Sequence, residues 1–202
     1  MFSALYDSSS TVPNKEYNVI QSVMPLILKK GFVGLGMQEI LETSKIPKGS
    51  FYHYFKSKEN FACVVLHQYI SSYREYLDYL VHAEGLARDR LLGFFELWID
   101  APGFETGLVE HCLVVKVAAE VSDLSEELRI VLDRGVASFI DYIAKIIAQG
   151  QIDESIKSKK NPDVLASMIY HMWIGAALIS KLQQSQAPLD QALKTTRILL
   201  SR

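Results

Sequence analysis

The stretch GMQEILETSKIPKGSFYHYFKSK, residues 36–58, decides the fold. It contains two short helical patterns with a break at residues 43–45. Gly36 is an acceptable N-cap for the first helix, and Glu39 lies where its carboxylate can reach back to unpaired backbone N–H groups. Pro47 suits the start of the second helix, because the N–H group that proline lacks has no helical partner there. The stretch therefore predicts a helix, a tight turn and a second helix.

The second of these helices has one apolar and one polar face. Phe51 and Phe55, one helical turn apart, predict the buried face. The residues that face outward from the first turns are Lys48, Gly49, Ser50, Tyr52 and His53. Four lysines and no acidic residue occur from Lys45 to Lys58. A short helix with a basic, aromatic N-terminal face behind a tight turn is the geometry that enters a DNA major groove.

The composition is that of an ordinary soluble globular protein with one or two small domains. The chain has 202 residues, of which 49% are hydrophobic and 22% are charged, and its formal net charge is −2. Residues 1–60 carry seven lysines and five acidic residues, whereas the remainder carries fourteen basic and eighteen acidic residues. A mildly basic end on an acidic body suits a small DNA contact and not a histone-like wrapper.

Several classes of protein are excluded by what the sequence lacks. Two cysteines, Cys63 and Cys112, do not predict a disulfide framework. No apolar run approaches the length needed to cross a bilayer, and no signal peptide is visible, so we expect a reducing cytoplasmic location. No P-loop, nucleophile elbow or HExxH motif occurs, and the glycine-rich residues 31–36 follow a helix instead of a strand. We therefore predict no enzyme activity and no cofactor.

Apolar residues recur at helical spacing along the rest of the chain, and no strand-like alternation occurs, so we predict an all-α fold. The N-terminal elements that we expect are a mobile arm over residues 1–13, a helix over 14–30, the two short helices within 36–55 and a long helix from Ser57. We then expect helices over 86–100, 107–121, 124–149 and 162–184, and a last short helix ending at Leu200. Pro25 would kink the first helix. Lys45 would cost about 1 kcal/mol if its φ is positive.

The motif also resembles a known family. IPKGSFYHYFKSKE, residues 46–59, resembles the helix-turn-helix of TetR-family transcriptional repressors, and KKGFVGLGMQEIL, residues 29–41, is similar to the segment that precedes it in that family. The resemblance covers about residues 20–61. Residues 107–135 look most like the branch that includes NemR and AcuR, repressors that respond to reactive electrophiles or small unsaturated acids.

The resemblance implies an organisation and a set of DNA contacts. It implies an N-terminal three-helix DNA-binding domain over residues 14–60, with its motif over 36–55, and an effector-sensing and dimerisation domain over 61–202. The residues that match family positions at base edges are Gln38, Lys48, Gly49 and Tyr52, and those that match phosphate contacts are Ser50, His53 and Lys58. A homodimer on a palindromic operator follows. The helices over 124–149 and 162–184 are the expected intersubunit four-helix bundle, although both apolar stripes could instead be core.

Cys112 is the candidate effector sensor. The predicted helix places Leu108, Val115 and Ala119 on its face and Lys116 one turn along, where an ammonium would lower the pKa of the thiol. Within the branch resemblance, Lys181 matches a position near the reactive cysteine. The alternative is that Cys112 is an inert core residue. The residues that could line a ligand pocket, each of which could equally be core, are Trp98, Tyr142, His171, Met172 and Trp173.

Two other functions fit the same residues. One is an all-α small-molecule-binding or thiol-scavenging protein without regulated DNA binding, and the other is a DNA-organising protein with no effector. Cys63 and His67 lie one helical turn apart, but two ligands without further clustering do not make a metal site. We therefore predict no metal.

Overall fold

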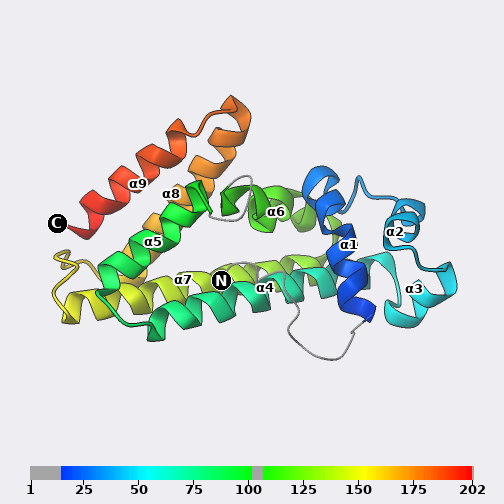
Figure 1. Ribbon diagram of the computed structural model, residues 1–202, viewed down its shortest axis with the longest axis horizontal. Helices are drawn as coiled ribbons and strands as arrows, with labels where there is room; N and C mark the ends of the chain where they lie inside the picture. The colour runs from blue at the N-terminus through cyan, green and yellow to red at the C-terminus, as the bar shows by residue number, and fades with distance from the viewer. Residues whose placement is uncertain (1–14, 102–106, 202) are drawn as a thin grey trace. The chain divides into compact units, whose positions relative to one another are not determined.

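The computed structural model describes residues 15–101 and 107–201, so the predicted N-terminal arm lies outside the described residues. The described ranges contain nine α-helices, a 3-10 helix and no strand, which confirms the all-α prediction (Figure 1). The elements in chain order are α1 (Lys15–Lys30), α2 (Met37–Ser44), α3 (Lys48–Tyr54), α4 (Lys58–His82), α5 (Ala87–Ile99), the 3-10 helix η2 (Leu108–His111), α6 (Leu113–Leu124), α7 (Glu126–Ile152), α8 (Pro162–Gln183) and α9 (Ala187–Leu200).

The chain divides into two compact units that differ from the predicted division after residue 60. The first unit is Met1–Ser72 together with Lys116–Arg134, and the second is Tyr73–Val115 together with Gly135–Arg202. Helices α4, α6 and α7 each contribute residues to both units. The unit that contains the helix-turn-helix therefore includes part of α6 and α7.

In the first unit, α1 packs against α2 and supplies a buried apolar face. The buried residues of α1 are Val19, Ile20, Val23, Met24 and Ile27. Pro25 lies on the exposed side, and α1 continues past it to Lys30. The predicted helix is thus present, and because Pro25 is exposed it does not interrupt the buried apolar face.

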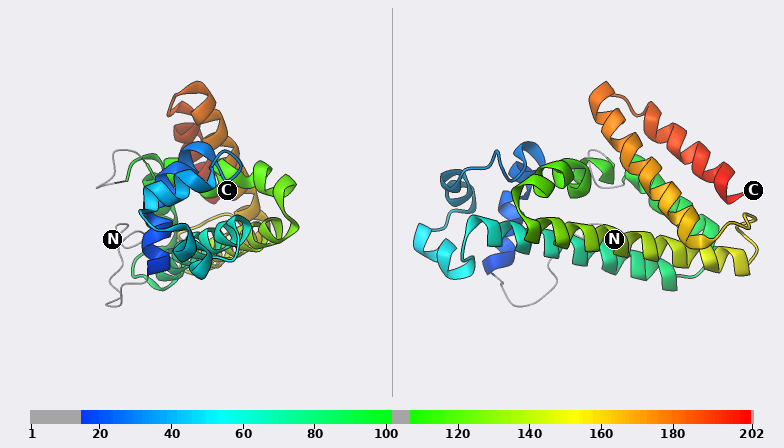
Figure 2. Two further views of the ribbon diagram at one scale, coloured as in Figure 1. Left: turned by 90° about the vertical axis from the view of Figure 1, so that its right-hand side faces the viewer. Right: turned by 180° about the vertical axis from the view of Figure 1, so that it is seen from behind.

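In the second unit, α8 packs against α9, and α5 packs against α9 and η2 (Figures 1 and 2). Trp173 of α8 joins these helices. Its ring stacks on Phe95 of α5 with a centroid distance of 4.6 Å. Its indole N–H donates to the hydroxyl of Thr196 of α9 over 3.0 Å. The start of α8 is capped, because the Asn161 side chain accepts the backbone N–H of Asp163 over 2.8 Å.

By length and composition alone, α8 could cross a bilayer, which differs from the expectation that no such stretch exists. It is the only helix in the described ranges that meets this test. A core helix of a soluble protein meets the same test, so one such helix is weak evidence for a membrane span.

The turn between α2 and α3 contains the strained residue that the sequence indicated. Lys45 has φ 55 and ψ 35, which is the left-handed region, and its N–H donates to the carbonyl of Leu41. A side chain with a Cβ is disfavoured there because the Cβ approaches the following carbonyl oxygen. Lys45 therefore closes α2 at a cost in free energy that glycine would avoid.

Replacing Lys45 with glycine is expected to raise the free energy of unfolding by about 1 kcal/mol, because glycine adopts a positive φ without that clash. Urea unfolding followed by circular dichroism measures the change. Lys45→Ala is the matched control, since it removes the charged side chain but keeps the Cβ, and its stability should equal that of the wild type. A glycine variant no more stable than the alanine variant would contradict the strain.

Candidate nucleic-acid interface and effector site

The helix α3 lies on an aromatic floor in the first unit. Phe51 of α3, Phe55 directly after α3 and Phe61 of α4 are each at most 1% exposed. Their ring centroids are 5.1 Å apart for Phe51 and Phe55, 5.6 Å for Phe51 and Phe61, and 5.0 Å for Phe55 and Phe61. A helix of seven residues is too short to be stable alone. These contacts therefore fix α3, as the spacing of Phe51 and Phe55 predicted.

The opposite face of α3 is open to solvent. Lys48, Gly49, Tyr52 and His53 are exposed, and Ser50 is half-buried. A Cβ built on Gly49 would meet no atom within 4 Å, so another molecule can approach the backbone closely there. The Tyr52 ring stands edge-on to Phe51 with the ring centroids 5.5 Å apart, and the residue is 45% exposed.

The remaining predicted contact residues lie on the flanking helices. Gln38 is exposed on α2, and its amide donates to the carboxylate of Glu42 over 2.8 Å. Lys58 is the first residue of α4, where Ser57 caps the helix by accepting the N–H of Asn60 over 3.0 Å. The N-terminal turn of a helix favours an anion through its dipole and free N–H groups. The first unit thus contains all seven residues predicted to meet DNA.

The prediction of one helix over residues 107–121 is wrong at Cys112, the candidate sensor. The chain forms η2 and then α6, and Cys112 is the residue between them. Cys112 is buried, with 2% of its surface exposed. The Lys116 ammonium donates to the carbonyl of Lys29 over 2.8 Å. The helical face that was expected to place Lys116 beside the thiol is therefore absent.

Other groups surround this segment in the second unit. Burial, followed by the neighbouring Cys112, raises the pKa of Tyr170 on α8. Lys181 of α8 pairs with Glu110 of η2, with 3.6 Å between the ammonium and the carboxylate. Burial also lowers the pKa of His111, and the charge of Lys181 acts in the same direction. The sequence indicated Lys181 but not Tyr170, because nothing in the spacing of α8 singles out a residue that meets Cys112.

The predicted pocket residues do not form one group. Trp98 and Trp173 are core residues whose rings meet edge-on at 5.9 Å. Tyr142 is half-buried on α7, with the Lys145 ammonium 4.8 Å from its ring centre, and His171 is exposed on α8. Only the tryptophan pair is brought together.

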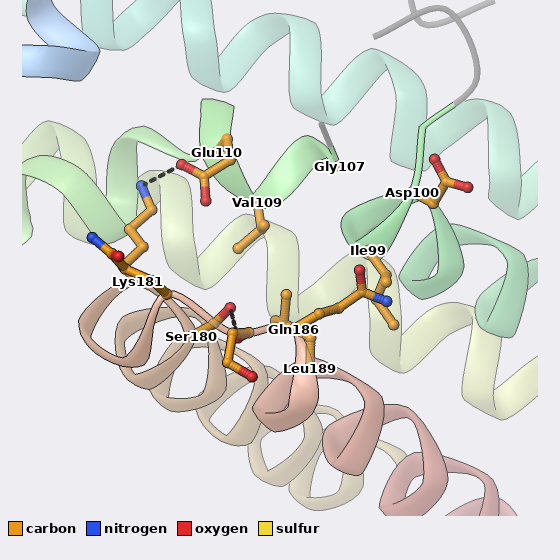
Figure 3. Close-up of a pocket in the computed structure, with 11 residues that line it drawn as sticks. Ile99, Asp100, Gly107, Val109, Glu110, Ser180, Lys181, Gln186 and Leu189 are labelled. Atoms are coloured by element: carbon orange, nitrogen blue, oxygen red, sulfur yellow. Dashed lines mark hydrogen bonds and ion pairs between the residues drawn. The ribbon is translucent and has the colours of Figure 1, made fainter. Parts of the chain in front are cut away.

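A cavity of about 590 Å³ lies in the second unit, between the end of α5, η2 and the α8–α9 connection (Figure 3). Its charged lining residues are Asp100, Glu110 and Lys181, and Figure 3 shows the last two facing each other. Ile99, Val109 and Leu189 supply an apolar wall. The cavity has the size of a small-molecule site and mixes apolar and charged groups.

Two models of one family match most of the chain. The model described as bacterial regulatory proteins, tetR family, matches residues 24–62, and the model described as tetracyclin repressor-like, C-terminal domain, matches residues 87–196. The chain is 35% identical over 177 residues to the HTH-type transcriptional repressor NemR of Escherichia coli strain K12, covering 87% of this chain and 88% of that protein. The chain belongs to the TetR family.

Solved structures agree with this assignment. A crystal structure of a TetR/AcrR family member has a TM-score of 0.84 and 46% identity, and covers 94% of this chain and 100% of that one. The reduced form of E. coli NemR has a TM-score of 0.84 and 34% identity, and covers 93% of this chain and 98% of that one. The transcriptional regulator AcuR of Cereibacter sphaeroides is 27% identical, covering 88% of this chain and 81% of that protein. The prediction of a TetR-type DNA-binding repressor is confirmed.

In this TetR-family chain, α8 has two apolar faces and α7 has one. The apolar residues of α7, namely Leu128, Leu132, Phe139, Ile143 and Ile147, are at most 5% exposed, so this stripe is core within a single chain. The second face of α8 is solvent-exposed and comprises Val164, Met168, Leu178, Ile179 and Leu182. Leu182 is 79% exposed, which is unusual for a large apolar side chain. The stripe of α8 therefore remains as a candidate interface, whereas that of α7 does not.

Cys63 differs from Cys112 in its surroundings. It is 3% exposed in the first unit, and its pKa is raised to about 11, first by burial and then by the charge and hydrogen bond of Glu127. No group of three or more His, Cys, Asp or Glu side chains in the described residues could hold a metal ion. Cys63 therefore stays protonated at neutral pH.

Iodoacetamide is expected to alkylate Cys63 very slowly in the native protein. With a pKa of about 11, only about one thiol in ten thousand is a thiolate at neutral pH. Mass spectrometry of tryptic peptides measures the rate, which should rise as the pH approaches the pKa, since the thiolate is the reactive form. Glu127→Gln should accelerate the reaction by removing a negative charge beside the thiol. Glu126→Gln removes the neighbouring carboxylate and should not accelerate the reaction. Equal rates in the two variants would exclude the role of Glu127 in raising the pKa of Cys63.

Proposed function

We propose that this protein is a homodimeric repressor that binds a palindromic operator and is released by a small molecule or by modification of Cys112. The observation that carries the DNA-binding part is the exposed basic and aromatic face of α3 above its buried phenylalanine floor. One such face reads few base pairs. Two copies related by a two-fold axis, with reading helices about 34–36 Å apart, would meet successive major grooves.

We propose a role for each of the predicted residues, following the family resemblance. Gln38, Lys48, Gly49 and Tyr52 would meet base edges, whereas Ser50, His53 and Lys58 would meet phosphates. Lys48 and Lys58 begin α3 and α4, and neither forms an ion pair within the described part of the chain. The Lys58 ammonium is thus available to a phosphate, which the N-terminus of α4 also attracts, and the Lys48 ammonium is available to a base edge. Direct contacts of this kind would make affinity fall steeply with salt.

Lys58→Ala is expected to weaken operator binding and to flatten the plot of log affinity against log salt by about 2 for the two copies in a dimer, because each lysine releases about one counterion. Fluorescence anisotropy with a duplex that the wild type selects from a random-sequence pool provides the measurement. Lys194→Ala, an exposed lysine on α9, is the control and should leave both affinity and slope unchanged. A Lys58→Ala dimer with the wild-type slope would exclude the phosphate contact.

The exposed stripe of α8 supports pairing with a second copy. Val164, Met168, Ile179 and Leu182 recur along one side of the helix, and Ile198 of α9 is also exposed. Apolar surface gains about 25 cal/mol for each Å² that leaves water. A two-fold contact between identical stripes would cover this surface in both copies, as a closed symmetric dimer requires.

Combining Ile179→Lys with Leu182→Lys is expected to weaken dimerisation by about a hundredfold or more, because the dimer would have to bury ammonium groups. Sedimentation velocity should then report a monomer, and specific operator binding should be lost with it. Gln183→Lys adds one charge beside Leu182 at an already polar position and should remain a dimer. A double variant that still sediments as the wild type would place the interface elsewhere.

Cys112 is the proposed sensor of electrophiles. A thiolate adds to an activated carbon–carbon double bond, forming an S–C bond while water supplies a proton to the adjacent carbon. Because Cys112 is 2% exposed, an adduct would overfill its surroundings and displace neighbouring elements. Tyr170 is near enough to Cys112 for the charge of Cys112 to affect its pKa. Glu110, two residues before Cys112, pairs with Lys181 of α8. A relative, NemR, has been solved in a form described as reduced, and this is in keeping with the thiol response that we propose for this protein.

The two states need only a small difference in free energy. An adduct or ligand that favours the released state by about 1–3 kcal/mol changes operator affinity by roughly 5- to 150-fold. The cavity beside Glu110 and Lys181 is a second place for such an effect, because a reversible ligand there would contact η2 and α8 together. Thiol modification and reversible binding are therefore both proposed routes to release.

N-ethylmaleimide is expected to weaken operator binding of the wild type and of Cys63→Ser by about tenfold or more, and to leave Cys112→Ser bound. Gel shift before and after treatment, with mass spectrometry of the adduct, measures both steps. Release of Cys112→Ser would place the reactive thiol elsewhere. Retention of all three proteins would exclude thiol switching and leave the cavity as the proposed effector site.

A further inference from the structure

The end of α1 and the turn to α2 lie at the edge of the helix-turn-helix. The last carbonyl groups of a helix have no partner within the helix. Gly31 ends α1 with φ +74, and the backbone then continues through Phe32 and Val33 towards α2. Lys30 of α1 pairs with Glu39 of α2 over 2.6 Å, so Glu39 bridges the two helices. The sequence had instead suggested that Glu39 caps the start of its own helix. We call residues 29–39 the α1–α2 corner.

Two charged side chains of α6 satisfy backbone groups of this corner. The Lys116 ammonium donates to the carbonyl of Lys29 over 2.8 Å. The Glu120 carboxylate accepts the N–H of Val33. Lys116 and Glu120 are one helical turn apart and so share a face of α6. A cation on a helix-terminal carbonyl and an anion on a free N–H are both charge-assisted hydrogen bonds, which are the stronger kind.

The corner is shaped to receive this pair. In this arrangement a Cβ on Gly31 would overlap the Glu120 carboxylate, and the positive φ of Gly31 also favours glycine there. Residues 116–134 belong to the same compact unit as α1, α2 and α3, although the family models assign residues 24–62 and 87–196 to separate domains. The unit that contains the helix-turn-helix thus includes residues that the family model assigns to the C-terminal domain.

We infer that Lys116 and Glu120 are positioning residues for DNA reading, which hold the α1–α2 corner and through it the helix-turn-helix. The inference rests on the proposed function and names a regulatory element of it. When the pair is lost, the corner samples other arrangements, and affinity falls in proportion to the fraction of molecules that remain competent to bind. Because α6 begins at Leu113, directly after Cys112, a displaced Cys112 segment changes the helix that carries both residues.

The first test measures, without DNA, whether Lys116 and Glu120 stabilise the α1–α2 corner. In the full-length protein, Glu120→Ala is expected to raise the hydrogen-exchange rate of the Val33 amide and of the surrounding corner, since that N–H loses its acceptor. Glu120→Gln keeps an acceptor oxygen and should retain most of the protection. Glu126→Ala removes an exposed carboxylate in the same unit and serves as the control. Unchanged exchange at Val33 in Glu120→Ala would overturn the inference.

The second test measures DNA reading with the duplex selected by the wild type. Glu120→Ala and Lys116→Met should each weaken binding by about tenfold, the effect of one charge-assisted hydrogen bond, while the salt slope stays at the wild-type value. A merely structural role would lower the melting temperature without the rescue by Glu120→Gln. Wild-type affinity in Glu120→Ala and Lys116→Met, despite faster exchange, would overturn the positioning role.

The two failures are distinguishable. If the wild type itself binds no duplex specifically, the proposed function fails, and the role of Lys116 and Glu120 in DNA binding fails with it. The exchange experiment still decides whether the two residues stabilise the α1–α2 corner. If the wild type binds and responds to N-ethylmaleimide, then Glu120→Ala should show less than half of the wild-type fold-change on treatment, because part of the released state is already present. A full response in Glu120→Ala would exclude the pair as the route of release.

Discussion

The burial of three phenylalanine rings beneath α3 is the interaction on which the rest depends. The helix has seven residues, its N-cap Pro47 makes no side-chain hydrogen bond, and its first turn contains no acidic residue. Neither a side-chain cap nor an acidic residue at its N-terminus therefore stabilises it. Phe51, Phe55 and Phe61 supply the stabilisation, since losing a buried phenylalanine side chain typically costs about 3–5 kcal/mol. Because the buried face supplies the stabilisation of α3, the exposed face can consist of residues that contact DNA.

The helix-turn-helix could be predicted from sequence because its determinants are local. The N-cap at Gly36, the cap at Ser57 and the spacing of Phe51 and Phe55 each involve residues within one or two turns. Even the strain at Lys45 follows from its place in the tight turn. Such features depend on backbone geometry and short-range packing, which a reader of the sequence can reconstruct.

The region around Cys112 could not be predicted in the same way because its contacts are distant along the chain. Apolar residues from Leu108 to Ala119 fit a helix, yet Gly107 packs against the carbonyls of Trp98 and Ile99, where a Cβ would overlap them. The segment forms η2 and α6, with Cys112 between them, instead of one helix. The partner of Lys116 is 87 residues away, and Glu120 bonds a backbone group at the same separation. A periodic pattern carries no information about which distant backbone group a charged side chain will meet.

The two cysteines illustrate why environment, and not residue type, decides chemistry in this chain. Cys63 lies beside Glu127, and burial together with that negative charge raises its pKa and suppresses the thiolate. Cys112 is equally buried but lies where a 3-10 helix gives way to α6, so a change in its volume acts on a junction between elements. A bulky adduct within a long helix is opposed by hydrogen bonds on both sides. At a junction, fewer such bonds oppose a rotation of the following helix, and in this chain that helix carries Lys116 and Glu120.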